Sequence, residues 1–265
     1  MRRYLALARL SNGPRLLAGS LLVAPGQAAV DLVILLALHH AGASLGTGGV
    51  AVAAGTIAFS VSAILQGRLI DRIGIRRVLG PAALALVMAT AGLAAAVALG
   101  AAPVLLVGLS AVLGLSQPAT SAAVRTAWTS ATTDADTRAT AFSYCSVIQD
   151  LGYVAGPALF GLVATAATPV ISLACCGALT AAGALAISSS APGPLSAGPV
   201  VPARARDLLR SVAPLATTMV AIGAALGAVD ISAPALAIQH GQPGLAGVLV
   251  AAFALGSLLG GLAYG

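Results

Sequence analysis

Three aspartates lie inside long apolar stretches of the sequence, where a carboxylate can carry a proton or bind a cation. Asp31, Asp150 and Asp230 are each surrounded by runs of Ala, Val, Leu and Gly. A charged aspartate at the centre of a membrane-spanning helix costs at least about 2.5 kcal/mol on insertion scales, so such a residue indicates a function by default. These acids are therefore the first candidates for a proton or substrate site.

Position distinguishes the three acids. Counted at about 1.5 Å per residue from residue 140, Asp150 lies roughly 15 Å along its apolar stretch, close to the middle of a bilayer. There it could load and release a proton, or it could stay neutral and only join helices by hydrogen bonds. Asp31 and Asp230 lie nearer the outer ends of their stretches and could line an outer mouth or have a structural role.

Three uncharged polar residues accompany these acids. Gln117, Gln149 and Tyr153 lie in apolar stretches. Such side chains either line a polar cavity or make hydrogen bonds that hold helices together. We include all three among the candidate proton or substrate residues.

A charged island, GRLIDRIGIRR at residues 67–77, interrupts the apolar sequence. A helix that ends at Gly67 can approach a neighbour closely, and Gly74 can adopt the positive φ of a tight turn. Asp71 lies between arginines, whose positive charge favours an ionised carboxylate. Taken alone, the island would be a solvated interhelical loop whose arginines set the topology.

The island resembles the signature loop of the major facilitator superfamily, G-x-x-x-D-R-x-G-R-R, which joins transmembrane helices two and three on the cytoplasmic side. Ile75 departs from that pattern. The resemblance implies a secondary transporter that moves a small molecule by alternating access, with this loop as a gating element. The matching residues are Gly67, Asp71, Arg72, Gly74, Arg76 and Arg77.

A second resemblance concerns the fifth helix. Gly152, Gly156, Pro157 and Gly161 resemble the fifth-helix motif of drug and metabolite antiporters, although Ser143 and Phe160 replace two of its glycines. Glycines four apart let a neighbouring helix pack closely, and proline bends a helix by removing a hydrogen bond. This resemblance implies proton-coupled efflux. The arginine that many proton-coupled members carry in helix four is replaced by Ser110, which weakens the coupling interpretation.

The whole chain has the composition of a polytopic membrane protein. Hydrophobic residues make up 59% and charged residues 8% of it, and its mean hydropathy is +1.01; about a quarter of a soluble domain is charged. The lipid bilayer is therefore a partner. The arginines are scattered between apolar stretches, so we predict no nucleic-acid binding. Cys145, Cys175 and Cys176 lack metal-site spacing, and we predict no metal and no cofactor.

Eight stretches are long enough to span a bilayer, which takes about twenty apolar residues. All thirteen arginines lie before the first stretch or after the second, fourth and sixth. The positive-inside rule then places the N-terminus and these loops in the cytoplasm of a multi-pass plasma (inner) membrane protein. The stretches are 16–38, 46–66, 78–100, 103–124, 140–163, 169–188, 211–236 and 245–265.

An internal repeat divides the chain, because Ala29-Val30-Asp31 recurs as Ala228-Val229-Asp230. With the family resemblance, it predicts an all-α fold of the major facilitator type: a six-helix half at 1–188, a cytoplasmic linker at 189–210, and helices seven and eight at 211–265. Helices nine to twelve are then absent, and we expect a truncated transporter. The alternative is a transport-incompetent fragment or membrane scaffold, which could self-associate to cover its exposed face.

One short motif suggests an enzyme. Residues 42–46 fit G-x-S-x-G, the nucleophile elbow, with Ser44 at its centre. That elbow requires a turn from a strand to a helix. Here the motif lies in a short outer loop between two apolar stretches, and the nearby His39 and His40 are not placed as a base on a later helix. We predict that the protein is not an enzyme.

Overall fold

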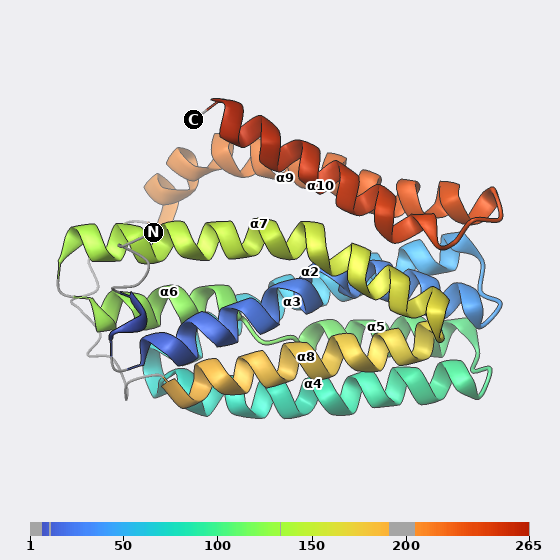
Figure 1. The fold of residues 1–265 in the computed structure, drawn as a ribbon, viewed down its shortest axis with the longest axis horizontal. Helices are drawn as coiled ribbons and strands as arrows, with labels where there is room; N and C mark the ends of the chain where they lie inside the picture. Colours follow the sequence, from blue (N-terminus) through green and yellow to red (C-terminus); the bar gives the residue numbers. More distant parts are fainter. Residues whose placement is uncertain (1–6, 11, 133, 191–204, 265) are drawn as a thin grey trace.

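The computed structural model describes residues 7–10, 12–132, 134–190 and 205–264, and the elements found in this part of the chain are α-helices (Figure 1). Their order is α2 (Gly13–His40), α3 (Leu45–Ile73), α4 (Ile75–Ala98), α5 (Pro103–Ser116), α6 (Thr120–Ala131), α7 (Ala135–Ala166), α8 (Pro169–Ser190), α9 (Ala205–Gln239) and α10 (Leu245–Tyr264).

The predicted all-α membrane fold is confirmed. Seven helical segments are long and apolar enough to cross a bilayer, with α5 and α6 together counting as one. The eighth predicted stretch corresponds to α10, which has 20 residues. The fourth stretch was expected as one continuous helix, and the structure breaks it between Ser116 and Thr120.

The predicted linker is only partly described. Residues 191–204 lie outside the described part of the chain, whereas α8 ends at Ser190 and α9 already begins at Ala205. Residues 205–210 of the predicted linker are therefore helical. The division of the chain at 188 and 211 remains a prediction.

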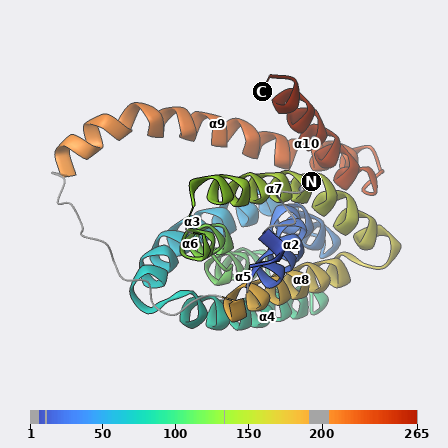
Figure 2. The same cartoon turned by 60° about the vertical axis from the view of Figure 1, so that its left-hand side comes forward.

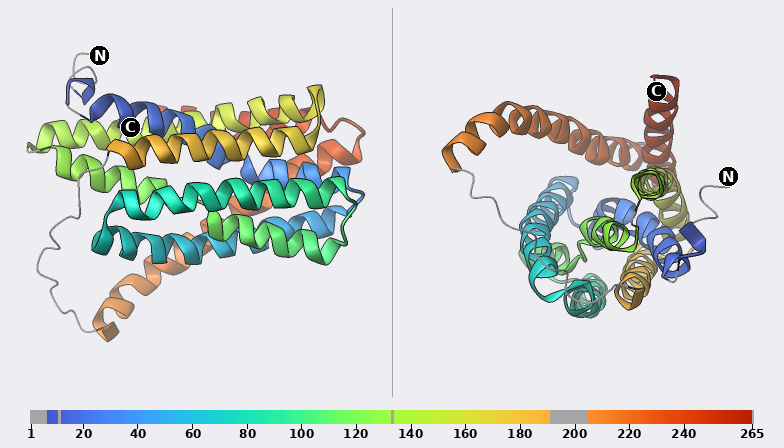
Figure 3. Two further views of the ribbon diagram at one scale, coloured as in Figure 1. Left: turned by 90° about the horizontal axis from the view of Figure 1, so that it is seen from below. Right: turned by 90° about the vertical axis from the view of Figure 1, so that its left-hand side faces the viewer.

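Helix α2 is the centre of the bundle. It packs along α7 and α8, while α3 packs on α5 and α4 packs on both α5 and α8 (Figures 1 and 3). Helix α10 packs on α7. Helix α9 packs against α10 at its C-terminal end, and its N-terminal end extends away from the bundle (Figure 2). The core consists of residues on the inner faces of these helices, with ten consecutive helical residues of α2, 29–38, nearly all buried.

The charged island is mostly helical. Helix α3 continues through Gly67 to Ile73, so the expectation that a helix ends at Gly67 is wrong, and a Cβ at Gly67 would meet nothing within 4 Å. The turn is instead made by Gly74 alone, whose φ of +88° confirms the predicted positive φ. The acidic and basic side chains of the island are exposed at this end of the bundle.

Helices α3 and α7 begin with side-chain caps. The Ser44 Oγ accepts a hydrogen bond from the Thr47 N–H at 3.1 Å, which caps α3. Ser44 is thus a helix cap in a short helix–helix loop, and the predicted absence of a nucleophile elbow agrees with this geometry. The Asp134 Oδ1 caps α7 by accepting from the Thr137 N–H at 2.7 Å, and this hydrogen bond lowers the pKa of Asp134 from its ordinary value.

The glycines of the fifth-helix motif lie at close helix crossings. A Cβ on Gly152 would lie 2.7 Å from atoms of Ala24, and one on Gly156 would collide with the Pro25 carbonyl, both on α2. A Cβ on Gly161 would lie 2.9 Å from the Cα of Gly247 on α10. Helix α7 therefore packs backbone to backbone against the first and the last described helices of the chain.

Helices α3 and α5 cross equally closely. A Cβ on Gly114 would collide with the Gly55 carbonyl oxygen and lie 2.8 Å from its carbonyl carbon. Neither atom is at the end of a flexible side chain, so the two helices would have to separate. Gly108, on the same helix α5, has nothing within 4 Å of its Cβ position.

We predict that Gly114→Ala lowers the free energy of unfolding by about 1–3 kcal/mol, because the added methyl group overpacks the crossing. Gly108→Ala is the matched control and should leave stability unchanged or raise it by up to about 1 kcal/mol, since alanine favours helix. Both values can be measured by reversible unfolding in detergent micelles. Equal effects of the two substitutions would contradict the close crossing.

Candidate functional site

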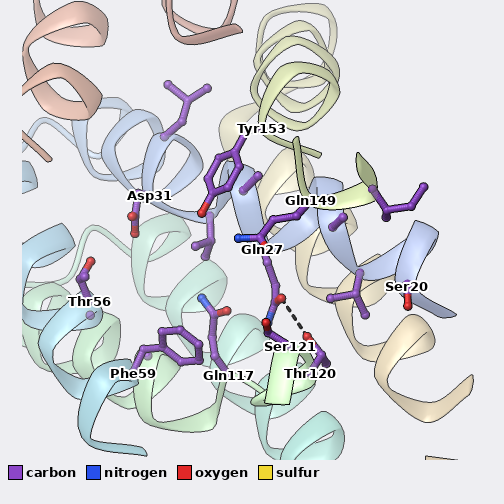
Figure 4. A pocket seen from close by; sticks show the side chains of 18 of the residues that line it. Ser20, Gln27, Asp31, Thr56, Phe59, Gln117, Thr120, Ser121, Gln149 and Tyr153 are labelled. Carbon is purple, nitrogen blue, oxygen red and sulfur yellow. Dashed lines mark hydrogen bonds between the residues drawn. The ribbon is translucent and has the colours of Figure 1, made fainter. Parts of the chain in front are cut away.

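A cavity of about 360 Å³ lies inside the bundle, bounded chiefly by α2, α3, α5, α6 and α7 (Figure 4). Helices α9 and α10 each contribute one lining residue, Asp230 and Val250. The volume is in the lower part of the range of about 300–1,000 Å³ that is typical of small-molecule sites. The polar side chains that line it are Ser20, Gln27, Asp31, Thr56, Gln117, Thr120, Ser121, Gln149, Tyr153 and Asp230.

Two of the three predicted acids meet at this cavity. Asp31 on α2 and Asp230 on α9 both line it, and their carboxylates are near enough to interact electrostatically. They occupy the repeated Ala-Val-Asp positions of the sequence. The two repeated positions, one on α2 and one on α9, therefore share one site.

Asp150 is placed differently. It is exposed on α7 and does not line the cavity, whereas Gln149 and Tyr153 on the same helix do. Residues four apart share one face of a helix, and a residue next to either of them points about 100° away. Gln117 also lines the cavity, so all three uncharged polar candidates reach it and the acid expected near the midplane does not.

The break between α5 and α6 forms one wall of the cavity. Gln117 is extended, with φ −61° and ψ 128°, as expected for a residue that precedes a proline. Pro118 itself has no N–H to continue the helix. The break leaves backbone carbonyl and N–H groups of a membrane-spanning segment without partners in their own helix, and side chains of other helices bind several of them.

Gln66 on α3 satisfies one side of this break. Its Nε2 donates to the Gln117 carbonyl at 2.8 Å, and its Oε1 accepts from the Ala119 N–H at 3.0 Å. The neighbouring Ser62 Oγ donates to the Leu115 carbonyl at 2.6 Å. Gln66 is only 8% exposed, so these hydrogen bonds lie in the packed interior.

Gln27 on α2 satisfies the other side. Its Nε2 donates to the Pro118 carbonyl at 2.9 Å, and the Thr120 hydroxyl donates to its Oε1 at 2.9 Å (Figure 4). Neither Gln27 nor Gln66 was among the residues predicted from the sequence. The sequence could have indicated them, because both are isolated glutamines in apolar stretches and Pro118 lies within the fourth predicted stretch.

The remaining predicted residues lie away from the cavity. None of the signature-loop residues lines it, because the island is at the end of the bundle where α3 meets α4. Among the residues that the structure describes, no three His, Cys, Asp or Glu side chains gather in a group that could hold a metal ion. Among the described residues that line the cavity, the charged groups are the carboxylates of Asp31 and Asp230, and the arrangement is suited to reversible binding of a small polar molecule.

The sequence model of the family described as the Major Facilitator Superfamily matches residues 16–265, which is nearly the whole chain. Comparison with curated proteins finds no match.

We predict that Gln66→Leu lowers the free energy of unfolding by at least about 2 kcal/mol, because it leaves a buried carbonyl and a buried N–H without partners, each worth about 1–3 kcal/mol. Gln149→Leu is the matched control: it is the same change at an exposed glutamine of the cavity wall. Unfolding in detergent micelles measures both. A Gln66→Leu protein as stable as Gln149→Leu would show that the break does not depend on this glutamine.

Proposed function

We propose, from the premise that this chain belongs to the major facilitator superfamily, that it is a secondary transporter that exports a small molecule by alternating access in exchange for protons. Membership itself makes it a multi-pass membrane transport protein of a family whose members are not enzymes. The direction of transport, the proton coupling and a plasma-membrane location with a cytoplasmic N-terminus are part of the proposal. The arginine asymmetry of the loops supports that orientation.

The observation that carries the proposal is the cavity. It is lined by apolar side chains, such as Phe59 and Ile34, and by a few convergent polar groups. This combination is typical of sites that bind a small molecule and orient it. In helical transporters such sites lie between two halves of the chain, and here α9 contributes Asp230 opposite the α2 residues.

We assign the proton-carrying role to Asp31 rather than to Asp150. Asp31 is partly buried and faces the cavity, where a substrate and a proton can compete for the same carboxylate. Two carboxylates near each other in a low-dielectric site are unfavourable when both are ionised, so Asp31 and Asp230 together suit the binding of a proton or a cation. Asp150 has no such neighbour facing the cavity.

The close packing of α7 supports the alternating movement. Gly156 packs on Pro25 of α2, and Gly161 packs on Gly247 of α10. Helix α7 thus touches both the first half of the chain and its continuation, and its proline provides a bend at this level. We propose that sliding at these glycine contacts accompanies opening and closing of the cavity.

We predict that Asp31→Asn abolishes proton-driven export, because the amide keeps the shape of the side chain but cannot titrate. Asp150→Asn is the matched control and should keep export near the wild-type rate. Flux of radiolabelled phenethylamine, a small cation, into everted vesicles from cells that express the transporter measures both. Loss of proton-driven flux in Asp150→Asn alone would instead support the interpretation based on sequence position.

The second candidate function is a membrane scaffold that does not transport by itself. The side chains of α9 between 213 and 226 are all exposed in the described structure, so much of this helix is open to a partner surface. An open face of this kind suits association with another subunit or with further helices. Self-association of the chain belongs to this candidate.

A flux assay separates the two candidates. Purified residues 1–265 are reconstituted into liposomes with an imposed proton gradient. If the scaffold candidate holds, phenethylamine flux should not exceed that of empty liposomes. Saturable, gradient-dependent flux would reject the scaffold and leave the transporter.

A further inference from the structure

The hydrogen bonds at the break between α5 and α6 satisfy its carbonyl groups more fully than its N–H groups. In the five consecutive positions 114–118, every carbonyl except that of Ser116 accepts a hydrogen bond from a polar group of another residue. The accepting carbonyls are those of Gly114, Leu115, Gln117 and Pro118. By contrast, the N–H groups of Ser121 and Ala122 have no acceptor within the described ranges, as expected in the first turn of a helix.

Of these two residues, Ser121 lines the cavity and Ala122 does not. Thr120 and Ser121, in the first turn of α6, both line it. The Thr120 hydroxyl is occupied by Gln27, whereas the Ser121 hydroxyl has no hydrogen-bond partner in the part of the chain that the structure describes. Helix α6 has 12 residues, so its dipole adds partial positive charge at this end. The wall therefore presents hydrogen-bond donors inside the membrane.

The side chain of Gln117 points to a ligand independently of the helix end. Gln117 is 7% exposed, and although its backbone carbonyl is bound by Gln66, its side-chain amide has no partner among the described residues. Figure 4 shows this amide reaching into the cavity between Asp31 and Ser121. The amide atoms stay accessible from the cavity, so a ligand bound there can form hydrogen bonds with them.

We propose that the Gln117 amide, the Ser121 hydroxyl and the free Ser121 N–H form a subsite for a carboxylate of the substrate. A carboxylate only accepts hydrogen bonds, so it matches the Gln117 Nε2, the Ser121 O–H and the Ser121 N–H as donors. Asp31 lies on the other side of Gln117 in Figure 4 and matches an ammonium group. The substrate class is then a small zwitterion, an inference that rests on the proposed function of the cavity as the substrate site.

Three probes of one shape test the two ends of the cavity separately. Phenylalanine carries both ions, phenethylamine only the ammonium and 3-phenylpropanoate only the carboxylate. The full chain in lipid nanodiscs is titrated with each probe, and the fluorescence of Trp128 reports binding, because it is the only tryptophan and lies on α6. Wild-type protein should bind phenylalanine at least about tenfold more tightly than either single ion, since a hydrogen bond to a charged group is worth about tenfold or more.

The variants should separate in a crossed pattern. Gln117→Leu and Ser121→Ala should each weaken phenylalanine and 3-phenylpropanoate by about tenfold and leave phenethylamine within about twofold. Asp31→Asn should weaken phenylalanine and phenethylamine and leave 3-phenylpropanoate unchanged. The probe that is retained by each variant shows that the variant is folded.

Two results would overturn the subsite alone. The first is equal affinity of the wild type for phenylalanine and phenethylamine, which would show that water satisfies the donors. The second is unchanged phenylalanine affinity in both Gln117→Leu and Ser121→Ala, which would show the same. Phenethylamine binding that depends on Asp31 would still support the proposed function in either case. Absence of binding by all three probes would reject the subsite and the cavity as the substrate site together.

Discussion

In the hydrocarbon core of a bilayer every backbone N–H and C=O group needs a partner from the protein, and the fourth membrane span cannot supply its own. Pro118 ends α5 and leaves three non-helical residues before α6 begins. Gln66 and Gln27 reach this break from two other helices and bind its carbonyls at 2.8 and 2.9 Å. The relative positions of α2, α3 and the fourth span depend on these hydrogen bonds.

The cavity follows from the same constraint. A continuous fourth helix would place side chains along this wall, whereas the break turns the chain and directs the start of α6 toward the interior. Glutamine suits the task because its amide both donates and accepts, so one side chain can bind the two ends of a broken helix. The N–H donors that remain free are those of the first turn of α6. They make this wall of the cavity a place where an acceptor can bind.

Glycine contacts between helices bring the other walls of the cavity close together. Gly114 meets Gly55 where α5 crosses α3, and Gly152 and Gly156 meet α2. At such crossings the helix backbones are in contact, which gives tight association without large apolar side chains. The same contacts can slide, since no side chains interlock there. The contact of Gly161 with Gly247 extends this arrangement to the second half of the chain.

The sequence alone determined the class of protein, the approximate spans, the turn at Gly74 and the family, because hydropathy, arginine placement and the charged island are local properties of the chain. It did not determine which acid faces the interior. Asp150 was favoured by depth, but the structure places Asp31 and Asp230 at the cavity and Asp150 on an exposed face. Only tertiary packing sets the rotation of each helix about its axis. Lipid and protein interior are both apolar, so the sequence of an almost wholly apolar helix hardly distinguishes its lipid-facing side from its interior-facing side. For the same reason the role of Gln27 and Gln66, which is to bind the backbone at the Pro118 break, is visible only in the packed structure.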